Sequence, residues 1–179
     1  APKFRVTNGS GRYDPKGALT LNADAVSTEY GPMSARVTES LTAPTIALRV
    51  ARPGLGVGLV DLEAVIKGTP SGAYAVEAKG GTNYGPFTAN VLIETANRLA
   101  VEIRSARFAG MDITGRIQQT AAGPFEGRVD FSGSGANGNV RLSAQGQFQR
   151  ADFDARATNA QIPGMAALTI GRAIVTGSI

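Results

Sequence analysis

Apolar and polar residues alternate along most of this chain, and three of the alternating segments open with the same signature. Gly31-Pro32 begins the first, and the pair recurs at Gly85-Pro86 and Gly123-Pro124. Glycine accepts the positive φ of a tight turn, and proline can begin a strand without donating to its ladder. A period of two places every second side chain on the same face of a strand. The sequence therefore predicts a repeated strand–turn unit with one apolar and one polar face.

The alternation predicts thirteen strands separated by short turns. The strands are expected at residues 3–8, 17–27, 33–42, 45–52, 57–67, 73–80, 87–95, 99–105, 111–119, 125–132, 139–147, 151–158 and 167–179. Clusters of Gly, Pro, Asn and Ser predict turns at 8–11, 14–17, 53–54, 70–72, 133–138 and 163–164. Short connections favour an antiparallel meander. The expected fold is all-β, a single antiparallel sheet curled lengthwise into a groove, with a two-sheet β-sandwich as the alternative.

The composition removes most routes to catalysis. The 179 residues include neither Cys nor His, so disulfides, thiolate nucleophiles and the commonest general base are absent. The commonest transition-metal ligand is absent with them. No run of about eighteen apolar residues predicts a transmembrane helix. No signal peptide opens the chain, which we therefore expect to be a mature or excised piece of a longer protein.

Carboxylates are the remaining candidates for chemistry. Two pairs, Asp61 with Glu63 and Asp152 with Asp154, each lie on one face of a predicted strand. Such pairs can bind calcium or hydrolyse glycosides. Neither has the extra oxygen donors of an ion site or an apolar pocket that would raise the pKa of a catalytic acid. The glycine run 54–58 lacks the helix that a dinucleotide site requires, and we interpret it as a turn or bulge. We predict no enzyme, catalytic residue, metal site or cofactor.

The positive charge is distributed over the predicted polar face. The net charge is +4, and fourteen of the eighteen basic residues are Arg. Arg36, Arg49 and Arg116 each alternate with apolar neighbours, so they are expected to be solvated on the outer face. Nucleic-acid binding would require clustered basic residues interleaved with exposed aromatics. The pattern therefore predicts no nucleic-acid partner, and the absence of Trp disfavours a carbohydrate-binding sandwich.

The apolar stripe is the most informative candidate site. Its members recur in phase along successive strands: Leu19, Leu21, Val37, Leu41, Ile46, Leu48, Leu62, Ile66, Val76, Phe87, Val91, Ile93, Leu99, Val101, Ile103, Ile113, Ile117, Phe125, Val129, Phe131, Val140, Leu142 and Phe153. Two sheets could press these residues together as an ordinary core. Alternatively, they line a groove that protein does not fill. Small in-phase residues favour the groove because they leave room: Ala23, Ala35, Ala89, Gly115, Gly127 and Ala144.

Three sequence features resemble the TamB family of translocation and assembly module proteins. These are the pattern Leu-x-Ala-Pro-x-Ile-x-Leu at 41–48, the stretch Ala-Arg-Phe-Ala-Gly at 106–110, and the Tyr-Gly-Pro strand openings at 30–32 and 84–86. The likeness extends over essentially the whole chain and is greatest to α-proteobacterial members. It implies an AsmA-like, bridge-like protein of the periplasm with an inner-membrane anchor outside this chain. The family fold is a long sheet folded around a hydrophobic groove, called a β-taco.

The resemblance implies a non-enzymatic function. A hydrophobic groove of this kind would shield phospholipid acyl chains during transport from the inner to the outer membrane. The full-length protein would work with a TamA-like outer-membrane partner. The alternative hypothesis is a chaperone-like module that assembles outer-membrane proteins by adding their strands to its own sheet edges. No catalytic residue of the family can be carried over to this sequence.

Overall fold

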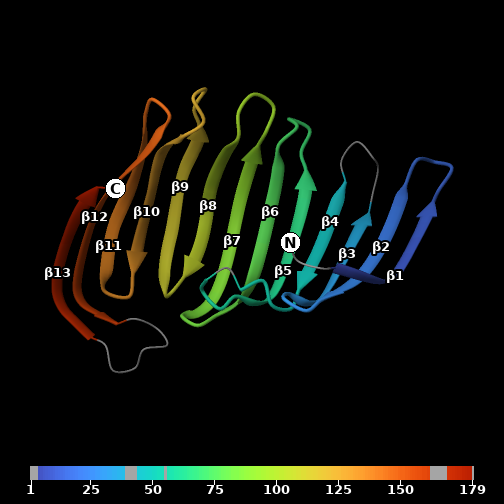
Figure 1. Cartoon of the computed structure of the whole chain (residues 1–179), viewed down its shortest axis with the longest axis horizontal. Helices are drawn as coiled ribbons and strands as arrows, with labels where there is room; N and C mark the ends of the chain where they lie inside the picture. The colour runs from blue at the N-terminus through green and yellow to red at the C-terminus, as the bar shows by residue number, and fades with distance from the viewer. Residues whose placement is uncertain (1–3, 39–43, 55, 162–168, 179) are drawn as a thin grey trace. The chain divides into compact units, whose positions relative to one another are not determined.

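The computed structural model of the chain describes residues 4–38, 44–54, 56–161 and 169–178 (Figure 1). Across these ranges the chain forms thirteen β-strands, with turns between them and no helix. The strands belong to one sheet, and their order in the sheet is their order along the chain. The predicted all-β fold with a single antiparallel sheet is thus confirmed. A two-sheet sandwich is ruled out by this order, because no second layer of strands is present in the described ranges.

The chain divides into two compact units, Ala1–Asn83 and Tyr84–Ile179, here named unit 1 and unit 2. Each is described by itself. The strands of unit 1 are β1 (Phe4–Tyr13), β2 (Leu19–Ser27), β3 (Gly31–Thr38), β4 (Thr45–Val50), β5 (Val60–Gly68) and β6 (Tyr74–Thr82). Each pairs antiparallel with the next. Register shifts in β1 and β5 mark irregularities of the β-bulge type.

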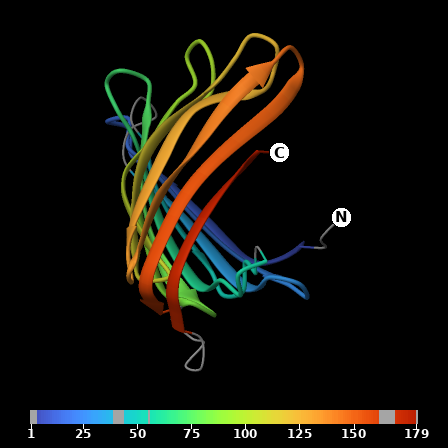
Figure 2. The ribbon, with the colours of Figure 1, turned by 90° about the vertical axis from the view of Figure 1, so that its left-hand side faces the viewer.

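Unit 2 continues the same design with longer strands. They are β7 (Gly85–Glu94), β8 (Ala100–Phe108), β9 (Met111–Gln119), β10 (Phe125–Gly133), β11 (Ala136–Gln145), β12 (Phe148–Gln161) and β13 (Thr169–Ser178). Every consecutive pair is antiparallel. Figure 2 shows that β11 and β12 curve along their length.

The three signature glycines have the backbone conformation that the sequence predicted. Gly31, Gly85 and Gly123 have φ angles of +71°, +105° and +107°. A residue with a Cβ rarely adopts these angles, which explains why glycine begins each repeat. Gly54, Gly56 and Gly58 also have positive φ, and the amide of Leu59 donates to the carbonyl of Gly54 at 3.0 Å. The glycine run therefore forms a turn, as interpreted from the sequence.

One predicted turn, at residues 8–11, is wrong, and another, at 133–138, is confirmed only in its first half. Residues 8–11 lie within β1, which extends to Tyr13. The register shift after Val6 is an irregularity inside the strand and does not reverse the chain. Asn137 and Gly138 lie inside β11, and the chain reverses earlier, at Ser134 and Gly135. Strand β5 also begins at Val60 rather than at residue 57, because the glycine turn occupies the intervening residues. The predicted turn at 163–164 and Leu41 lie outside the described residues.

The sheet has very little enclosed interior. The buried apolar residues of the described ranges are Leu59, Ala64, Ala73, Ala100, Ala109 and Ala160. Five of these six are alanines, and extensive contact between strands is confined to strands that are consecutive in the chain. A packed core would instead bury large side chains between two layers. The apolar side chains of this chain are therefore stabilised by their neighbours within the sheet.

Candidate apolar binding faces

The strand register of unit 1 gathers apolar side chains on one face. Directly paired residues of antiparallel strands project on the same side of a sheet. One row across five strands is Leu21, Val37, Ile46, Ile66 and Val76, and a parallel row is Ala25, Met33, Val50 and Leu62. A row of four alanines and one leucine lies between them: Ala23, Ala35, Leu48, Ala64 and Ala78. These three rows define the apolar face of unit 1, which bears no charged side chain.

Unit 2 has a corresponding face. One row is Val91, Ile103, Gly115, Val129, Val140 and Phe153. The rows on either side of it are Ile93, Val101, Ile117, Gly127, Leu142 and Ala151, and Ala89, Ala106, Ile113, Phe131, Gly138 and Ala155. These rows define the apolar face of unit 2, and they too contain no charged residue. The predicted stripe is thus divided between two faces, each continuous within its own unit.

The exposure of these side chains distinguishes a binding face from a core. Of the residues that the sequence put forward for the stripe, none that the structure describes is buried. Leu21 is 43% exposed and Leu99 is 36% exposed, and the other described candidates are half-buried. Contacts along the sheet account for the half that is covered, because no second layer packs on them. Both faces therefore have apolar surface in contact with solvent, the property expected of a ligand or partner surface.

The glycines on the apolar face of unit 2 do not leave the open space that the sequence suggested. A Cβ at Gly115 would lie 2.7 Å from the Cα of Val129, and one at Gly127 would lie 2.8 Å from the Cα of Ile117. The neighbouring backbone occupies the space instead. Glycine is required here for a close approach of strands, as is common where a sheet bends sharply. Any room on this face therefore lies above the side chains rather than in gaps at the glycines.

The opposite face of each unit is charged and is cross-linked by ion pairs. In unit 1, Glu63 of β5 accepts from Arg49 of β4 at 3.4 Å and from Lys79 of β6 at 3.0 Å. In unit 2, Arg116 of β9 donates to Glu94 at 2.9 Å, and it also lies 3.9 Å from Glu102. Exposed pairs of this kind add little stability individually. Because these ion pairs lie on the face opposite the apolar rows, their arginines are solvated on one face, as the alternation predicted.

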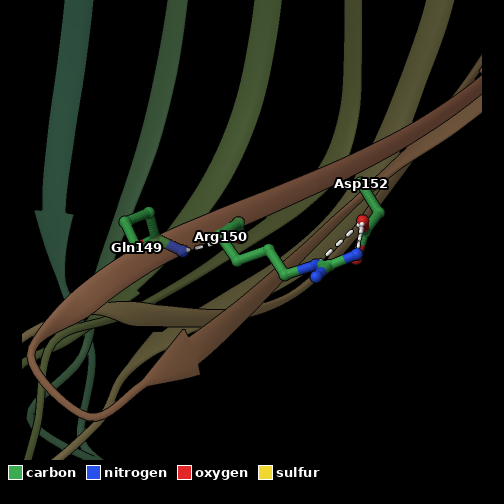
Figure 3. A network of polar contacts seen from close by, with 3 residues as sticks. All are labelled: Gln149, Arg150 and Asp152. Atoms are coloured by element: carbon green, nitrogen blue, oxygen red, sulfur yellow. Dashed lines mark hydrogen bonds and ion pairs between the residues drawn. The ribbon is translucent and has the colours of Figure 1, made fainter. Parts of the chain in front are cut away.

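One carboxyl of each acid pair has a lowered pKa. The Arg150 guanidinium donates to Asp152 at 2.7 Å (Figure 3) and lowers the pKa of that carboxyl. The Lys79 ammonium, with Arg49, lowers the pKa of Glu63. A general acid at neutral pH requires the opposite shift. Among the described residues, no three acids are grouped so that they could hold a metal ion.

A glutamine side chain links β12 to the start of β10 in unit 2. Gln149 of β12 pairs with Ala144 of β11, and its side chain passes this small residue to reach β10. There its Oε1 accepts from the amide of Phe125 at 2.7 Å, and its Nε2 donates to the Phe125 carbonyl at 2.9 Å. The same nitrogen donates to the carbonyl of Arg150 at 3.1 Å (Figure 3). A side-chain amide thus takes the place of a β-ladder pair where β10 begins.

Some residues of the apolar faces were not included in the predicted stripe. Val50 and Met33 complete a row of unit 1, and Ala106 and Ala155 contribute to one of unit 2. The alternation does place Met33 and Val50 on the apolar side, since Met33 lies two residues before Ala35 and Val50 two residues beyond Leu48. Ala106 could not be found this way, because the register shift between Ile103 and Ala106 reverses the phase of the alternation within β8.

Comparison of the chain with protein-family models, with curated proteins and with solved structures found no significant match. In the described part of the chain, no helix has the length and apolarity needed to cross a membrane.

Proposed function

We propose that this chain is a non-enzymatic lipid-binding segment whose apolar faces shield phospholipid acyl chains. The proposal rests on one observation: the rows of apolar side chains are continuous across the strands, and these side chains are partly exposed. Apolar side chains extend over five strands or more in each unit, none of the described candidates is buried, and no charge interrupts the rows. A soluble domain ordinarily covers a surface of this extent. Acyl chains would provide the missing cover.

The driving force is removal of apolar surface from water. Each methylene group buried contributes about 0.8 kcal/mol, so a long acyl chain gains enough to offset the loss of its own freedom. Over most of its area, each apolar face has no polar side chain that could form a directional hydrogen bond with a ligand. It would therefore accept chains of different length and unsaturation, as transport of bulk phospholipid requires. The charged face remains hydrated and keeps the segment soluble.

This proposal agrees with the resemblance to the TamB family. It places the chain in the periplasm, within a longer protein anchored in the inner membrane and working with a TamA-like outer-membrane partner. Lipid would pass along the apolar faces between the two membranes. The supporting observations are the open apolar faces and the repeated strands.

A second candidate function is strand addition to outer-membrane proteins. Strand β1 favours it, because all of its residues are exposed and the described chain pairs it only with β2. Val6 is 69% exposed and Tyr13 is 64% exposed. An edge with unpaired backbone groups and few charges can accept another strand. This function would depend on the edge of β1 and would not require the apolar faces.

The two candidates are separated by substitutions on unit 2. Ile103→Arg and Val129→Arg each place a charge within one row of the apolar face, whereas Thr114→Arg adds the same charge to the opposite face of β9. Native mass spectrometry of the purified chains would measure the fraction that retains phospholipid. We expect occupancy to decrease at least about tenfold in the first two variants, because a guanidinium in contact with acyl chains is strongly unfavourable.

Circular dichroism would verify that all three variants keep their β structure, and Thr114→Arg should bind lipid like the unmodified chain. Unchanged lipid retention in folded Ile103→Arg and Val129→Arg would contradict the proposal and leave strand addition as the better account. Absence of lipid from the unmodified chain, even after incubation with phospholipid vesicles, would contradict it as well.

A further inference from the structure

Two asparagine–glycine pairs, Asn8-Gly9 and Asn137-Gly138, lie within β-strands of this chain. Asparagine is chemically labile, and it loses its side-chain amide most readily before glycine. Glycine has no Cβ to obstruct attack by its own backbone nitrogen on the asparagine side chain. Both asparagines are exposed. Exposure therefore does not distinguish the two pairs, and the difference between them lies in the surroundings of the glycine.

The backbone nitrogen of Gly9 points away from β2. At the hairpin end of the β1–β2 ladder, the amide of Asp14 donates to the carbonyl of Ala18 at 2.8 Å. Bonded and non-bonded pairs alternate along an antiparallel ladder, so the pair of Gly9 with Ala23 is of the non-bonded kind. Among the described residues, no strand pairs with the other edge of β1. The Gly9 nitrogen is therefore open to solvent and carries no ladder hydrogen bond.

Gly138 has neighbours on both sides. It pairs with Phe131 of β10 and with Ala155 of β12, and each amide of an interior strand faces one neighbouring strand or the other. A Cβ at Gly138 would collide with the Phe131 ring, whereas one at Gly9 would meet no atom within 4 Å. The local rearrangement that brings an asparagine side chain onto the following nitrogen is thus unobstructed at Gly9 and hindered at Gly138.

We propose that Asn8 is a site of spontaneous covalent modification, with water as the only co-reactant. The Gly9 nitrogen loses its proton to water and forms a bond to Cγ of Asn8, and the Cγ–Nδ2 bond breaks to release ammonia. Water then opens the cyclic imide. Addition at Cγ gives aspartate, and addition at the backbone carbonyl carbon gives isoaspartate, in which the main chain passes through Cγ. One water is consumed and one ammonia is released, without oxidation or reduction.

Either product would weaken the edge of unit 1. Asn8 pairs with Asp24 of β2, so an aspartate at this position would stand opposite another carboxylate, and like charges directly opposite each other destabilise a sheet. Isoaspartate adds a methylene group to the main chain and would move the following residues out of register with β2. The modification would therefore loosen β1 from Asn8 toward Tyr13. This inference concerns the backbone of β1 and does not depend on lipid binding.

The test is incubation of the folded, unmodified chain in mildly alkaline buffer, followed by proteolysis and peptide mass spectrometry. We expect Asn8 to be modified at least about tenfold faster than Asn137, because an exposed edge opens more easily than an interior strand. In urea, where both pairs are unfolded, the two rates should converge. Equal rates in the folded chain would overturn the proposal. A difference that persists unchanged in urea would overturn it as well, since the fold would then not control the rate.

Gly9→Ala tests the cyclic route. The added Cβ meets no neighbouring atom, so the strand should be retained, and circular dichroism would verify this. The methyl group hinders attack by the backbone nitrogen, and we expect modification of Asn8 to slow at least about tenfold while that of Asn137 is unchanged. An undiminished rate at Asn8 would show direct hydrolysis of the side chain and contradict the proposed route.

Asn8→Asp reproduces one product, and Asn8→Ser is the uncharged control. The amide of Ser10 belongs to a bonded pair with Asn22 of β2, so its hydrogen exchange reports on the attachment of the edge strand. We expect exchange at Ser10 to be at least about threefold faster in Asn8→Asp than in Asn8→Ser, because of the repulsion from Asp24. Equal exchange in the two variants would contradict the weakening of β1.

Discussion

The ring of Phe131 on β10 lies over Gly138 on β11, where a Cβ would be only 2.6 Å from the ring atom Cζ. The two residues are directly paired across the strands. Gly138 is also close to the backbone of β12, because its Cβ would lie 2.8 Å from the Cα of Ala155. An aromatic ring that covers a glycine in this way stabilises a strand where glycine alone would weaken it. This contact explains why Asn137-Gly138 is part of a strand rather than a turn.

Replacement of Gly138 by Ala should therefore destabilise unit 2 despite the higher strand propensity of alanine. The added methyl group would collide with the Phe131 ring on one side and with the backbone of β12 on the other. We expect a decrease of about 1–3 kcal/mol in the free energy of unfolding, measured by urea denaturation. Gly9→Ala is the control, because no atom lies within 4 Å of its Cβ position. An equal effect of the two substitutions would show that space at Gly138 is not limiting.

The Gln149 contact should control the opening of the N-terminal end of β10. Gln149→Ala removes both hydrogen bonds to the backbone of Phe125, so its amide should exchange with deuterium faster. We expect protection at Phe125 to decrease about tenfold while the amide of Val129, further along β10, is unaffected. Hydrogen exchange followed by NMR measures both sites. Gln147→Ala, a change at the adjacent hairpin, should leave Phe125 protected.

Acid should destabilise the charged faces in a defined pH range. Arg150 lowers the pKa of Asp152 from its ordinary value of 3.8, and Lys79 lowers that of Glu63 from 4.5. The unfolded chain therefore binds protons at higher pH than the folded chain does. The stability that these carboxylates contribute is fully present above their ordinary pKa values and is lost as the pH falls through the lowered ones.

Urea midpoints recorded at decreasing pH would follow this loss. In Arg150→Gln the pKa of Asp152 should return toward its ordinary value, so less stability remains to be lost in acid. The difference between the variant and the unmodified chain should accordingly be greatest near neutral pH and shrink below the ordinary pKa of Asp152. A difference that stays constant over the whole range would show that the ion pair does not contribute to the pH dependence.

The hairpin between β10 and β11 can be improved. Ser134 has a φ of +52° and Gly135 has a φ of +77°, the two positive angles of a type I′ turn, which favours Asn-Gly. Ser134→Asn should raise the free energy of unfolding by a few tenths to about 1 kcal/mol, because Asn tolerates the left-handed conformation better than Ser does. Ala121→Asn, in a hairpin position without positive φ, should give no such increase in thermal denaturation.

The number of strands and their faces could be predicted because both depend on local alternation. Ile46, Leu48 and Val37 were assigned to one side from their spacing alone, and the register confirms that they share it. The turn at Ser134-Gly135 was harder to separate from Asn137-Gly138, since both pairs suit a hairpin. The decision depends on Phe131, a residue of the neighbouring strand, whose ring requires a glycine opposite it.

The alignment of Asp24 with Arg49 on one face could not be predicted from the sequence. The two residues are 25 positions apart in the chain, and they are aligned only because β2, β3 and β4 adopt one specific register. A shift of one residue in any of these pairings would move the charges to the apolar face. The role of Gln149 was equally inaccessible, because a side chain that replaces a ladder pair has no signature in the alternation.

Each strand depends chiefly on the strand before it and the strand after it, and this has a consequence for how such a chain can change in evolution. Within either unit, the insertion or deletion of one complete hairpin would create two new neighbours and leave the other pairings intact. A globular core does not allow this, since every element shares the same interior. The number of strands can thus vary between related chains without a change in how the remaining strands fold.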